Sequence, residues 1–202
     1  MSELDTFTLA LPSKYASKDA SASAPATQPK TPSIEWLERT WTVTHSTLSM
    51  WRSARNVRIS YKRLPAKSDG RARIDDLVEY EPIKKTGVLS KVEGVDTQAA
   101  DGSWNWRGKG WLFFVTSHWE LLGSGEVKLP SGETERWAVT WFAPTVFTSE
   151  GLDVYCDKEE GISSETYSKI SEALTKIGAK GLVDMVNKDM KPVEIKLPWT
   201  KQ

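Results

Sequence analysis

Apolar and polar residues alternate along most of the chain between residues 41 and 156. The alternation is clearest in residues 56–64, where an apolar set opposes a polar one: Val57, Ile59 and Tyr61 against Arg58, Ser60 and Lys62. A period of two residues is typical of a β-strand with one buried face and one solvated face. The same period recurs in residues 41–45, 74–81, 88–95, 104–107 and 136–142. With weaker segments included, the pattern predicts about nine strands.

The segment 103–122 (SWNWRGKGWLFFVTSHWELL) is the most aromatic part of the chain, with four of its ten tryptophans. Trp104 and Trp106 share one strand face. From Trp111 onward both faces are apolar, which predicts a strand covered on both sides. In the rest of this strand, positions 116, 118 and 120 lie on one face and positions 117, 119 and 121 on the other. The pattern does not decide which face is inside.

After Gly161 the period changes from two residues to that of a helix. Ser163 or Ser164 can cap a helix whose apolar side is formed by Tyr167, Ile170, Leu174 and Ile177. Gly178 ends this helix, and residues 182–186 predict a second short one. At the other end, Ser33 can cap a helical turn over residues 34–37 that could plug a barrel. Residues 191–202 could pair with an edge strand or lie extended.

Short connections without alternating helices favour an antiparallel sheet, and a sheet with one apolar face removes its edges by closing on itself. We therefore predict a mainly β protein, with a single antiparallel up-and-down β-barrel of about 8–10 strands, a short N-terminal helical turn and C-terminal helices. Residues 1–32 are rich in Ser, Ala, Thr, Pro and Lys and predict a disordered tail, within which Thr8–Pro12 could lie on the folded body. Residues 33–160 form the barrel, and residues 161–202 a C-terminal helix and tail packed on it.

Charge and cysteine content narrow the classes of partner. The chain has 202 residues, with 27 Lys and Arg against 27 Asp and Glu. This balance disfavours nucleic acid and anionic lipid as main partners. No segment approaches the ~20 apolar residues of a membrane span. A single cysteine and an N-terminus without signal-peptide features favour a cytoplasmic protein.

The ten tryptophans have two interpretations. They fill a structural core, or several of them line a ligand cavity, since aromatic walls are typical of small-molecule sites. In the second case the candidate ligand-binding residues are Trp41, Tyr61, Tyr80, Trp106, Phe114, Trp137 and Trp141. The Met50–Trp51 pair, in a loop over residues 46–53, is either a lid or plug, or a portal.

Two histidines and one glutamate are the candidate catalytic residues. Trp41 and Val43 mark an inner face, so His45 is expected to point inward. His118 and Glu120 are two residues apart, so their side chains share a strand face and could act as an acid–base pair. Asp76 and Tyr80 could join them from another strand, or each histidine could be purely structural. Two histidines and one cysteine match no metal-ligand spacing, and we expect neither metal nor cofactor.

Three short runs carry a resemblance to a known family: Thr44–Leu48 (THSTL), Asp75–Tyr80 (DDLVEY) and Trp106–Trp111 (WRGKGW). With the helical turn, the tryptophan-bearing first strand, the strand meander and the C-terminal helix, the chain resembles a lipocalin-like (calycin) barrel, and in particular small fungal lipocalin-like proteins. The resemblance covers residues 33 to about 178. Lipocalins usually carry Gly-x-Trp at the first strand, whereas Arg39-Thr40-Trp41 lacks the glycine.

The resemblance implies carriage of a small hydrophobic ligand, and some lipocalin-like barrels are instead cyclases, isomerases or decarboxylases. Two hypotheses follow. In the first, the protein binds a small hydrophobic or aromatic molecule in an aromatic-lined barrel. In the second, it is a cofactor-independent isomerase or cyclase of a natural-product intermediate, acting by a pericyclic or proton-transfer reaction with His45, His118 or Glu120 in the cavity.

Overall fold

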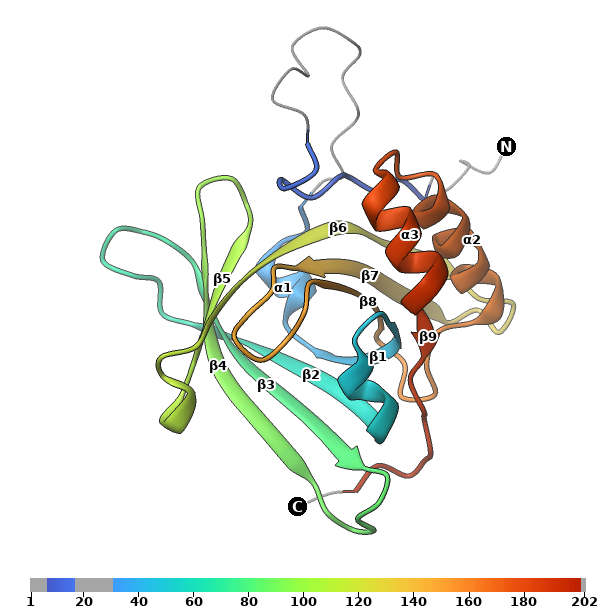
Figure 1. The fold of residues 1–202 in the computed structure, drawn as a ribbon, viewed down its shortest axis with the longest axis horizontal. Helices are drawn as coiled ribbons and strands as arrows, with labels where there is room; N and C mark the ends of the chain where they lie inside the picture. Colours follow the sequence, from blue (N-terminus) through green and yellow to red (C-terminus); the bar gives the residue numbers. More distant parts are fainter. Residues whose placement is uncertain (1–6, 17–30, 201–202) are drawn as a thin grey trace, which may run out of the picture.

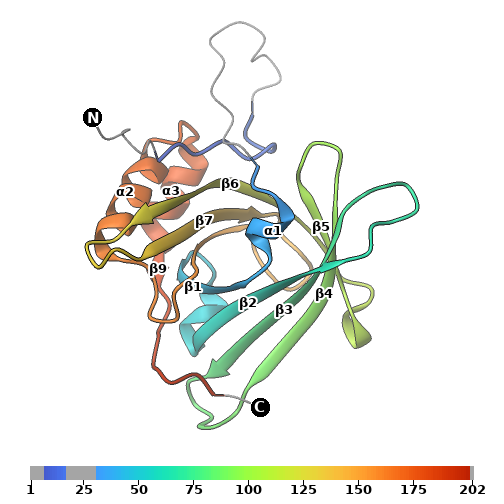
Figure 2. The same cartoon turned by 180° about the vertical axis from the view of Figure 1, so that it is seen from behind.

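Eight antiparallel strands close into a barrel in the computed structural model, which describes residues 7–16 and 31–200 (Figure 1, Figure 2). Their order is β2-β3-β4-β5-β6-β7-β8-β1, and β1 pairs with β2 to close the sheet. The strands are β1 (Thr40–Ser46), β2 (Ala54–Leu64), β3 (Arg73–Pro82), β4 (Ser90–Gln98), β5 (Trp104–Gly108), β6 (Thr116–Lys128), β7 (Thr134–Phe142) and β8 (Gly151–Cys156). The predicted up-and-down barrel is confirmed.

A ninth strand, β9 (Lys191–Pro192), enters the barrel wall between β1 and β2. These two strands pair directly only over residues 40–42 of β1. Beyond that point β9 pairs with the end of β1, and the Val193 amide donates to the Thr44 carbonyl at 2.9 Å. On the other side the Asn56 amide of β2 donates to the Glu194 carbonyl at 2.8 Å. The C-terminal segment therefore fills the seam where β1 and β2 diverge.

A short helix closes one end of the barrel. In α1 (Ile34–Leu37), the N-cap Ser33 accepts a hydrogen bond from the Trp36 amide, and Leu37 is buried. The Trp41 indole donates to the Leu37 carbonyl at 3.0 Å, which fastens the helix to β1. The Arg39 guanidinium lies over the rings of both Trp36 and Trp41. The predicted helical turn is confirmed, and it covers the barrel end where β1 begins.

Two register shifts change which side chains face inward. In β1 the pairing with β8 shifts between Val43 and His45, and in β6 the pairing with β7 shifts between Leu121 and Gly123. An extra residue in one strand reverses the alternation beyond it. Val43 therefore lies in the inner cluster, whereas His45 lies outside the barrel on the ring of Tyr167.

Residues 110–115 are not the strand that the sequence predicted. Gly110–Leu112 form a 3-10 turn, η2, and β6 begins only at Thr116. A side chain at Gly108 would lie 2.6 Å from the Leu112 Cβ, so the glycine permits the turn to fold back. The apolar rings of this turn point into solvent, with Trp111 74 % exposed.

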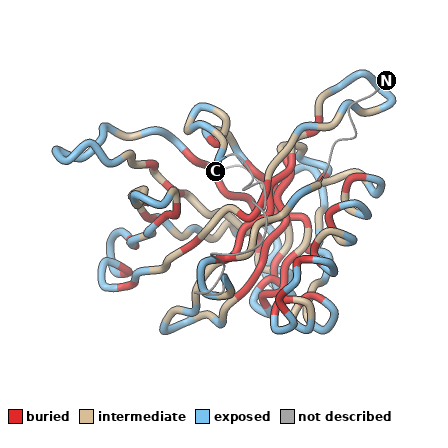
Figure 3. Tube along the Cα trace, turned by 90° about the horizontal axis from the view of Figure 1, so that it is seen from above, coloured by how far each residue is buried: buried red, intermediate tan, exposed pale blue. Residues whose placement is uncertain are grey.

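The outer face of β6, β7 and β8 is buried beneath the C-terminal helices α2 (Ser164–Thr175) and α3 (Lys180–Asp189) (Figure 1). Figure 3 shows how the buried residues concentrate at the centre of the molecule. Apolar residues of the strands and of both helices form one cluster: Leu122, Trp137, Val139, Trp141, Leu152, Val154, Ile170, Leu174, Leu182 and Val186. No helix among the described residues is long and apolar enough to cross a membrane. The C-terminal helices predicted from the sequence are confirmed.

Residues 7–16 also lie on this outer side. The Ala10 amide donates to the Leu122 carbonyl at 2.7 Å, and Phe7 stacks on Trp137 at 4.9 Å. A side chain at position 123 would meet Leu9 at 2.5 Å, so Gly123 allows this close approach. The disordered tail predicted for residues 1–32 therefore does not extend through 7–16, and its remaining parts, 1–6 and 17–30, fall outside the described residues.

Candidate functional site

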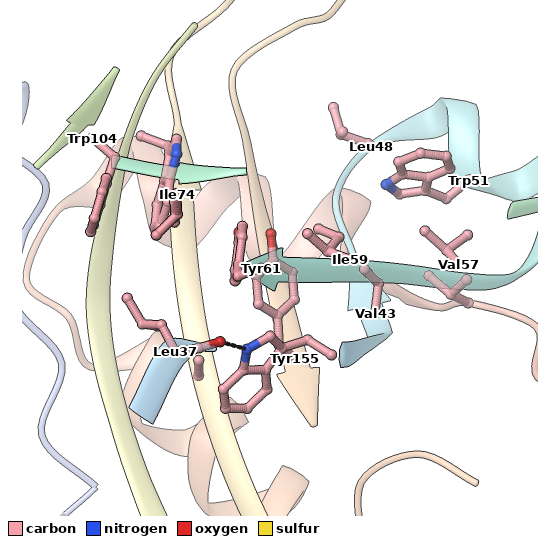
Figure 4. Close-up of a cluster of buried hydrophobic side chains, with 14 of the residues drawn as sticks. Leu37, Val43, Leu48, Trp51, Val57, Ile59, Tyr61, Ile74, Trp104 and Tyr155 are labelled. Carbon is pink, nitrogen blue, oxygen red and sulfur yellow. Dashed lines mark hydrogen bonds between the residues drawn. The ribbon is translucent and has the colours of Figure 1, made fainter. Parts of the chain in front are cut away.

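The inner face of the barrel is aromatic over its closed half. Tyr61, Trp119 and Trp104 stack in a row, with ring centroids 6.0 and 5.7 Å apart. Figure 4 shows Tyr61 and Trp104 among the buried side chains of this half, with Ile59 and Val43 nearby. These side chains are nearly inaccessible to water. This half is a packed core that fixes the positions of the strands.

The open half of the inner face is less completely covered. Tyr80, Trp106, Leu121 and Phe142 pack on the inner cluster but remain partly exposed. A side chain at Gly94 would lie 2.1 Å from the Trp106 indole nitrogen, so the indole lies directly on the β4 backbone. These four side chains form an apolar, partly solvated surface inside the barrel mouth.

The 3-10 turn η1 (Ser49–Ser53) places Trp51 at this mouth. Trp51 is buried and meets Tyr80 edge to face at 5.4 Å, whereas Met50 is 40 % exposed. Of the two interpretations of the Met50–Trp51 pair, the structure supports the lid or plug for Trp51.

Two buried carboxyl groups lie beneath the apolar surface, on neighbouring strands. Asp76 of β3 and Asp96 of β4 are 7 % and 0 % exposed, and the Trp119 indole donates to Asp96 Oδ1 at 2.8 Å. Burial raises the pKa of Asp76 well above its usual range, and repulsion from Asp96 adds to this rise. Burial also raises the pKa of Asp96, against the opposing hydrogen bond from Trp119. The two raised pKa values favour retention of a proton by the pair as a unit.

A third buried carboxyl group, Asp153 of β8, belongs to the same inner face. Burial raises its pKa to about 7, although a hydrogen bond from Ser46 opposes the shift. Tyr155, two residues on, interacts with Tyr61 and with the carboxyl groups, and burial raises its pKa well above the usual range. Polar groups thus cross the barrel from Asp96 to Asp153 by way of the two phenols.

Several of these buried polar atoms have no hydrogen-bond partner among the described residues. They include Oδ1 of Asp76, Oδ2 of Asp96, Oδ1 of Asp153 and the indole nitrogens of Trp51 and Trp104. Asp76 and Asp96 nevertheless interact with each other through a shared proton, and Asp153 interacts with the Trp51 indole. The barrel interior therefore combines apolar walls with carboxyl groups whose partners are mainly one another.

The candidate ligand-binding residues divide into two groups. Trp41, Tyr61, Tyr80 and Trp106 lie on the inner face. Trp137 and Trp141 belong to the outer cluster under the helices, and Phe114 follows η2 with 57 % exposure, so their placement inside the barrel is wrong. Trp137 and Trp141 do alternate as predicted, but β7 is buried on both faces and burial alone does not identify the inner one. Ligand contact by the four inner residues stays a prediction.

The candidate catalytic residues all lie outside the barrel. The His45 imidazole stacks on Tyr167 of α2 with centroids 3.4 Å apart, and burial lowers its pKa to about 4. His118 Nε2 lies 3.0 Å from Glu120 Oε1, so the two side chains are neighbours. However, Glu120 also accepts hydrogen bonds from Ser13 on the outer surface. The expectation that these three residues face an inner cavity is wrong, because the β1 bulge turns His45 outward and Trp119 occupies the inner face of β6.

Asp96, Asp153 and Tyr155 are interior residues that the sequence pattern did not identify as candidates. Asp96 follows the two-residue period of Val92 and Gly94, which places it on the inner face of the strand. A carboxylate at such a position is a sequence signal for a polar group inside the barrel. Asp153 lies between Leu152 and Val154, which are apolar and are buried on the outer face. The alternation therefore suggests that Leu152 and Val154 face inward and that Asp153 faces solvent. Asp76 was correctly placed on the Val78 and Tyr80 face.

A separate groove lies outside the barrel wall. It has a volume of about 590 Å³ and runs between η1, the loop 143–150 and α3, with Met50, Phe147 and Met185 among its lining residues. Its charged groups, such as Lys188 and Asp184, are at the surface, and none of the unpartnered interior atoms faces it. Within residues 7–16 and 31–200, no cluster of acidic, His or Cys side chains could hold a metal ion. We therefore place the candidate site inside the barrel mouth.

Comparison with solved structures shows similarity to crustacyanins. The chain matches lobster apocrustacyanin A1 at 10 % identity and a TM-score of 0.51, over 83 % of this chain and 82 % of that one. Apocrustacyanin C1 matches at 13 % identity, with the same TM-score and coverage. H1 crustacyanin from the lobster Homarus americanus matches at 10 % identity and a TM-score of 0.51, over 78 % of this chain and 76 % of that one.

These similarities establish the fold. It is a lipocalin-like calycin barrel, as the resemblance implied. No model of a protein family matches the chain, and no curated protein matches it. The resemblance to fungal proteins gains no support from the comparisons.

Proposed function

We propose that this lipocalin-like barrel binds a small, mainly apolar molecule that carries a hydrogen-bond donor. The apolar part would lie on Tyr80, Trp106, Leu121 and Phe142 in the barrel mouth, where burial of its surface supplies affinity. The donor would meet the Asp76–Asp96 carboxyl pair, whose two groups otherwise interact only with each other and with the Trp119 indole. The observation that carries the proposal is this buried pair of carboxyl groups below an aromatic surface that remains partly open to solvent.

The choice of donor follows from charge. A ligand carboxylate would meet the interior carboxyl groups and lose its hydration without gaining a partner of opposite sign. A hydroxyl or ammonium group would donate to these carboxyl groups instead. The fold of the crustacyanins supports a barrel of this kind, and the ligand class rests on the interior groups alone.

Isothermal titration calorimetry with naphthylmethanol, naphthylmethylamine and naphthoate tests this proposal. These probes share one ring system and differ in the polar group. The alcohol and the amine are expected to bind, and naphthoate at least ~10-fold more weakly, because of the charge repulsion. Asp76→Asn should weaken amine binding by roughly tenfold, while Glu93→Gln on the outer face of the adjacent strand β4 leaves it unchanged.

Two results would contradict the proposal. Equal binding of naphthoate would remove the role of the carboxyl pair. Binding that is lost in Met185→Ala but retained in Trp106→Ala would move the site to the outer groove.

The same carboxyl pair favours proton transfer as a second candidate function. Two neighbouring buried carboxyl groups with raised pKa values could act as an acid–base pair, which His45, His118 and Glu120 cannot supply from outside the barrel. Deuterium exchange into an aromatic β,γ-unsaturated ketone, followed by NMR in D₂O, tests it. Faster exchange with the protein than with Asp96→Asn supports catalysis. Exchange at the buffer rate excludes it for that probe.

A further inference from the structure

The open end of the barrel exposes an unusual concentration of apolar side chains. Among the described residues, nine large hydrophobic side chains are exposed, and all except Leu197 belong to four loops at this end. The loops are 48–53, 83–89, 109–115 and 143–150. Trp111, Phe113, Val146 and Phe147 are 74 %, 64 %, 78 % and 63 % exposed. Patches of this kind on a folded domain mark interaction sites.

These loops form one continuous surface. Phe114 meets Phe113 and Phe147 edge to face, which joins the loops 109–115 and 143–150. The Ile83 amide donates to the Ser53 carbonyl at 2.9 Å, which joins the loops 48–53 and 83–89. The groove between η1 and Phe147 connects the two pairs. We refer to the four loops together as the open rim.

The charges of the open rim are almost all positive. It carries Arg52, Lys84, Lys85 and Lys109, and three of its loops have no acidic residue. Its one carboxylate, Glu150, accepts from the Trp141 indole at 2.8 Å and pairs with Lys14. Lys109 pairs with Asp75 of β3, whereas Lys84 and Lys85 are exposed and form no salt bridge among the described residues.

The loops at the closed end show the opposite composition. The segments 65–72, 99–103, 129–133 and 157–163 carry three basic residues (Lys67, Arg71, Lys158) and six acidic ones (Asp69, Asp101, Glu133, Asp157, Glu159, Glu160). None of the exposed large hydrophobic side chains lies there. The neutral net charge of the chain therefore conceals a separation of charge between its two ends.

We propose that the open rim docks on an anionic lipid bilayer. Exposed Trp and Phe next to Lys and Arg are the side chains that insert at the headgroup level of a bilayer, and the basic residues complement anionic lipids. A symmetric contact between two copies is less favoured, because it would bring the basic residues of both rims together. Docking through the open rim directs the barrel mouth at the membrane. An apolar ligand would then pass from the bilayer into the barrel without crossing water. This inference goes beyond ligand binding and does not depend on it.

Flotation of the full chain with vesicles tests the proposal, using phosphatidylcholine alone and phosphatidylcholine mixed with phosphatidylserine. We expect binding to the mixed vesicles that falls at high salt, and little binding to the neutral ones. Trp111→Ser combined with Phe113→Ser should lower the vesicle-bound fraction at least ~10-fold, since both rings are lost from the interface. Lys84→Glu combined with Lys85→Glu should do the same on the mixed vesicles.

Matched controls come from outside the rim. Lys67→Glu combined with Arg71→Glu makes the same charge change at the closed end, and Leu197→Ser removes an exposed apolar side chain elsewhere. Both should bind vesicles like the unmodified protein. The proposal is overturned if the protein does not float with mixed vesicles, if the closed-end change weakens binding as much as the rim change, or if the rim instead mediates a dimer. In that last case, size-exclusion chromatography would show a concentration-dependent dimer that Trp111→Ser abolishes, and the protein would not bind vesicles.

Discussion

The two ends of the barrel use tryptophan in opposite ways. At the closed end, the Arg39 guanidinium lies over the rings of Trp36 and Trp41. The Trp36 indole also donates a hydrogen bond to Glu126 at 2.9 Å. At the open end, Trp111 is 74 % exposed, and no ring of the described part of the chain stacks on it. The closed end also pairs its charges, since Arg136 contacts both Glu126 and Asp157. The closed end therefore satisfies its aromatic and charged groups internally, whereas the open end leaves Trp111 to solvent.

The largest expected effect is on the free energy of unfolding, and it appears when one tryptophan from each end is replaced. Trp41→Ala should lower the free energy of unfolding by about 3–5 kcal/mol, because it opens a cavity under α1 and removes a buried hydrogen bond. Trp111→Ser should change it by about 0.5 kcal/mol or less. Urea denaturation measures both. Similar losses for the two variants would contradict the comparison.

The buried carboxyl groups give the next largest effect, as a dependence of stability on pH. Their folded-state pKa values are raised, to about 7 for Asp153. The folded protein therefore keeps protons that the unfolded chain releases near pH ~4. Stability from these groups is fully present below that pH and is lost as the pH rises through about 7. The melting temperature should fall over this window.

Asp96→Asn isolates one of these groups. The amide can still accept from Trp119 but carries no charge, so the variant should gain on the order of 1–3 kcal/mol at pH 8 and show a shallower pH dependence. Glu93→Gln on the same strand is the control and should follow the unmodified protein. An Asn variant that is less stable at pH 8 would show that Asp96 is not a source of the pH dependence.

The ionic contacts of the closed end should contribute less. Arg136→Met should lower the free energy of unfolding by about 1 kcal/mol or less, because the Arg136 side chain is 30 % exposed and water screens its ion pairs. The loss should shrink when denaturation is repeated at high salt. A loss independent of salt would contradict an ionic origin of the effect.

The smallest expected effect concerns the outer histidine. His118→Ala should leave the affinity for naphthylmethylamine unchanged within about twofold, since His118 and Glu120 lie outside the barrel. Calorimetry on this variant and on Asp76→Asn completes the comparison. A tenfold loss of affinity in His118→Ala would indicate that His118 and Glu120 belong to the ligand-binding site.

The sequence predicted the fold well where the alternation is uninterrupted. In β2 and β5 the inner residues Tyr61, Trp104 and Trp106 follow the simple period of two. The errors occur where one residue is added or where both faces are buried. A single extra residue in β1 turns His45 outward. None of the residue types in Val43–His45 is typical of a bulge, so the sequence does not predict this register shift. In β7 the helices bury the outer face, so Trp137 and Trp141 look like inner residues.

The candidate site was harder to predict than the fold. Asp96 and Asp153 lie inside because strands distant in sequence bring them to one interior, and each is surrounded locally by ordinary strand residues. The apolar run Trp111–Val115 is predicted as a buried strand by any hydrophobicity argument, yet the turn after Gly108 leaves most of it in water. A run that is both apolar and exposed is informative only once the structure is seen.

The C-terminal segment in the β1–β2 seam has a geometric consequence. At the level of Thr40–Thr42 eight strands make up the circumference, whereas at the level of His45 and Asn56 the inserted segment adds a ninth. The wall therefore gains one strand toward the end of the barrel where β1 finishes. Residues 191–194 complete the wall there, and Val193 adds a buried side chain to the inner cluster.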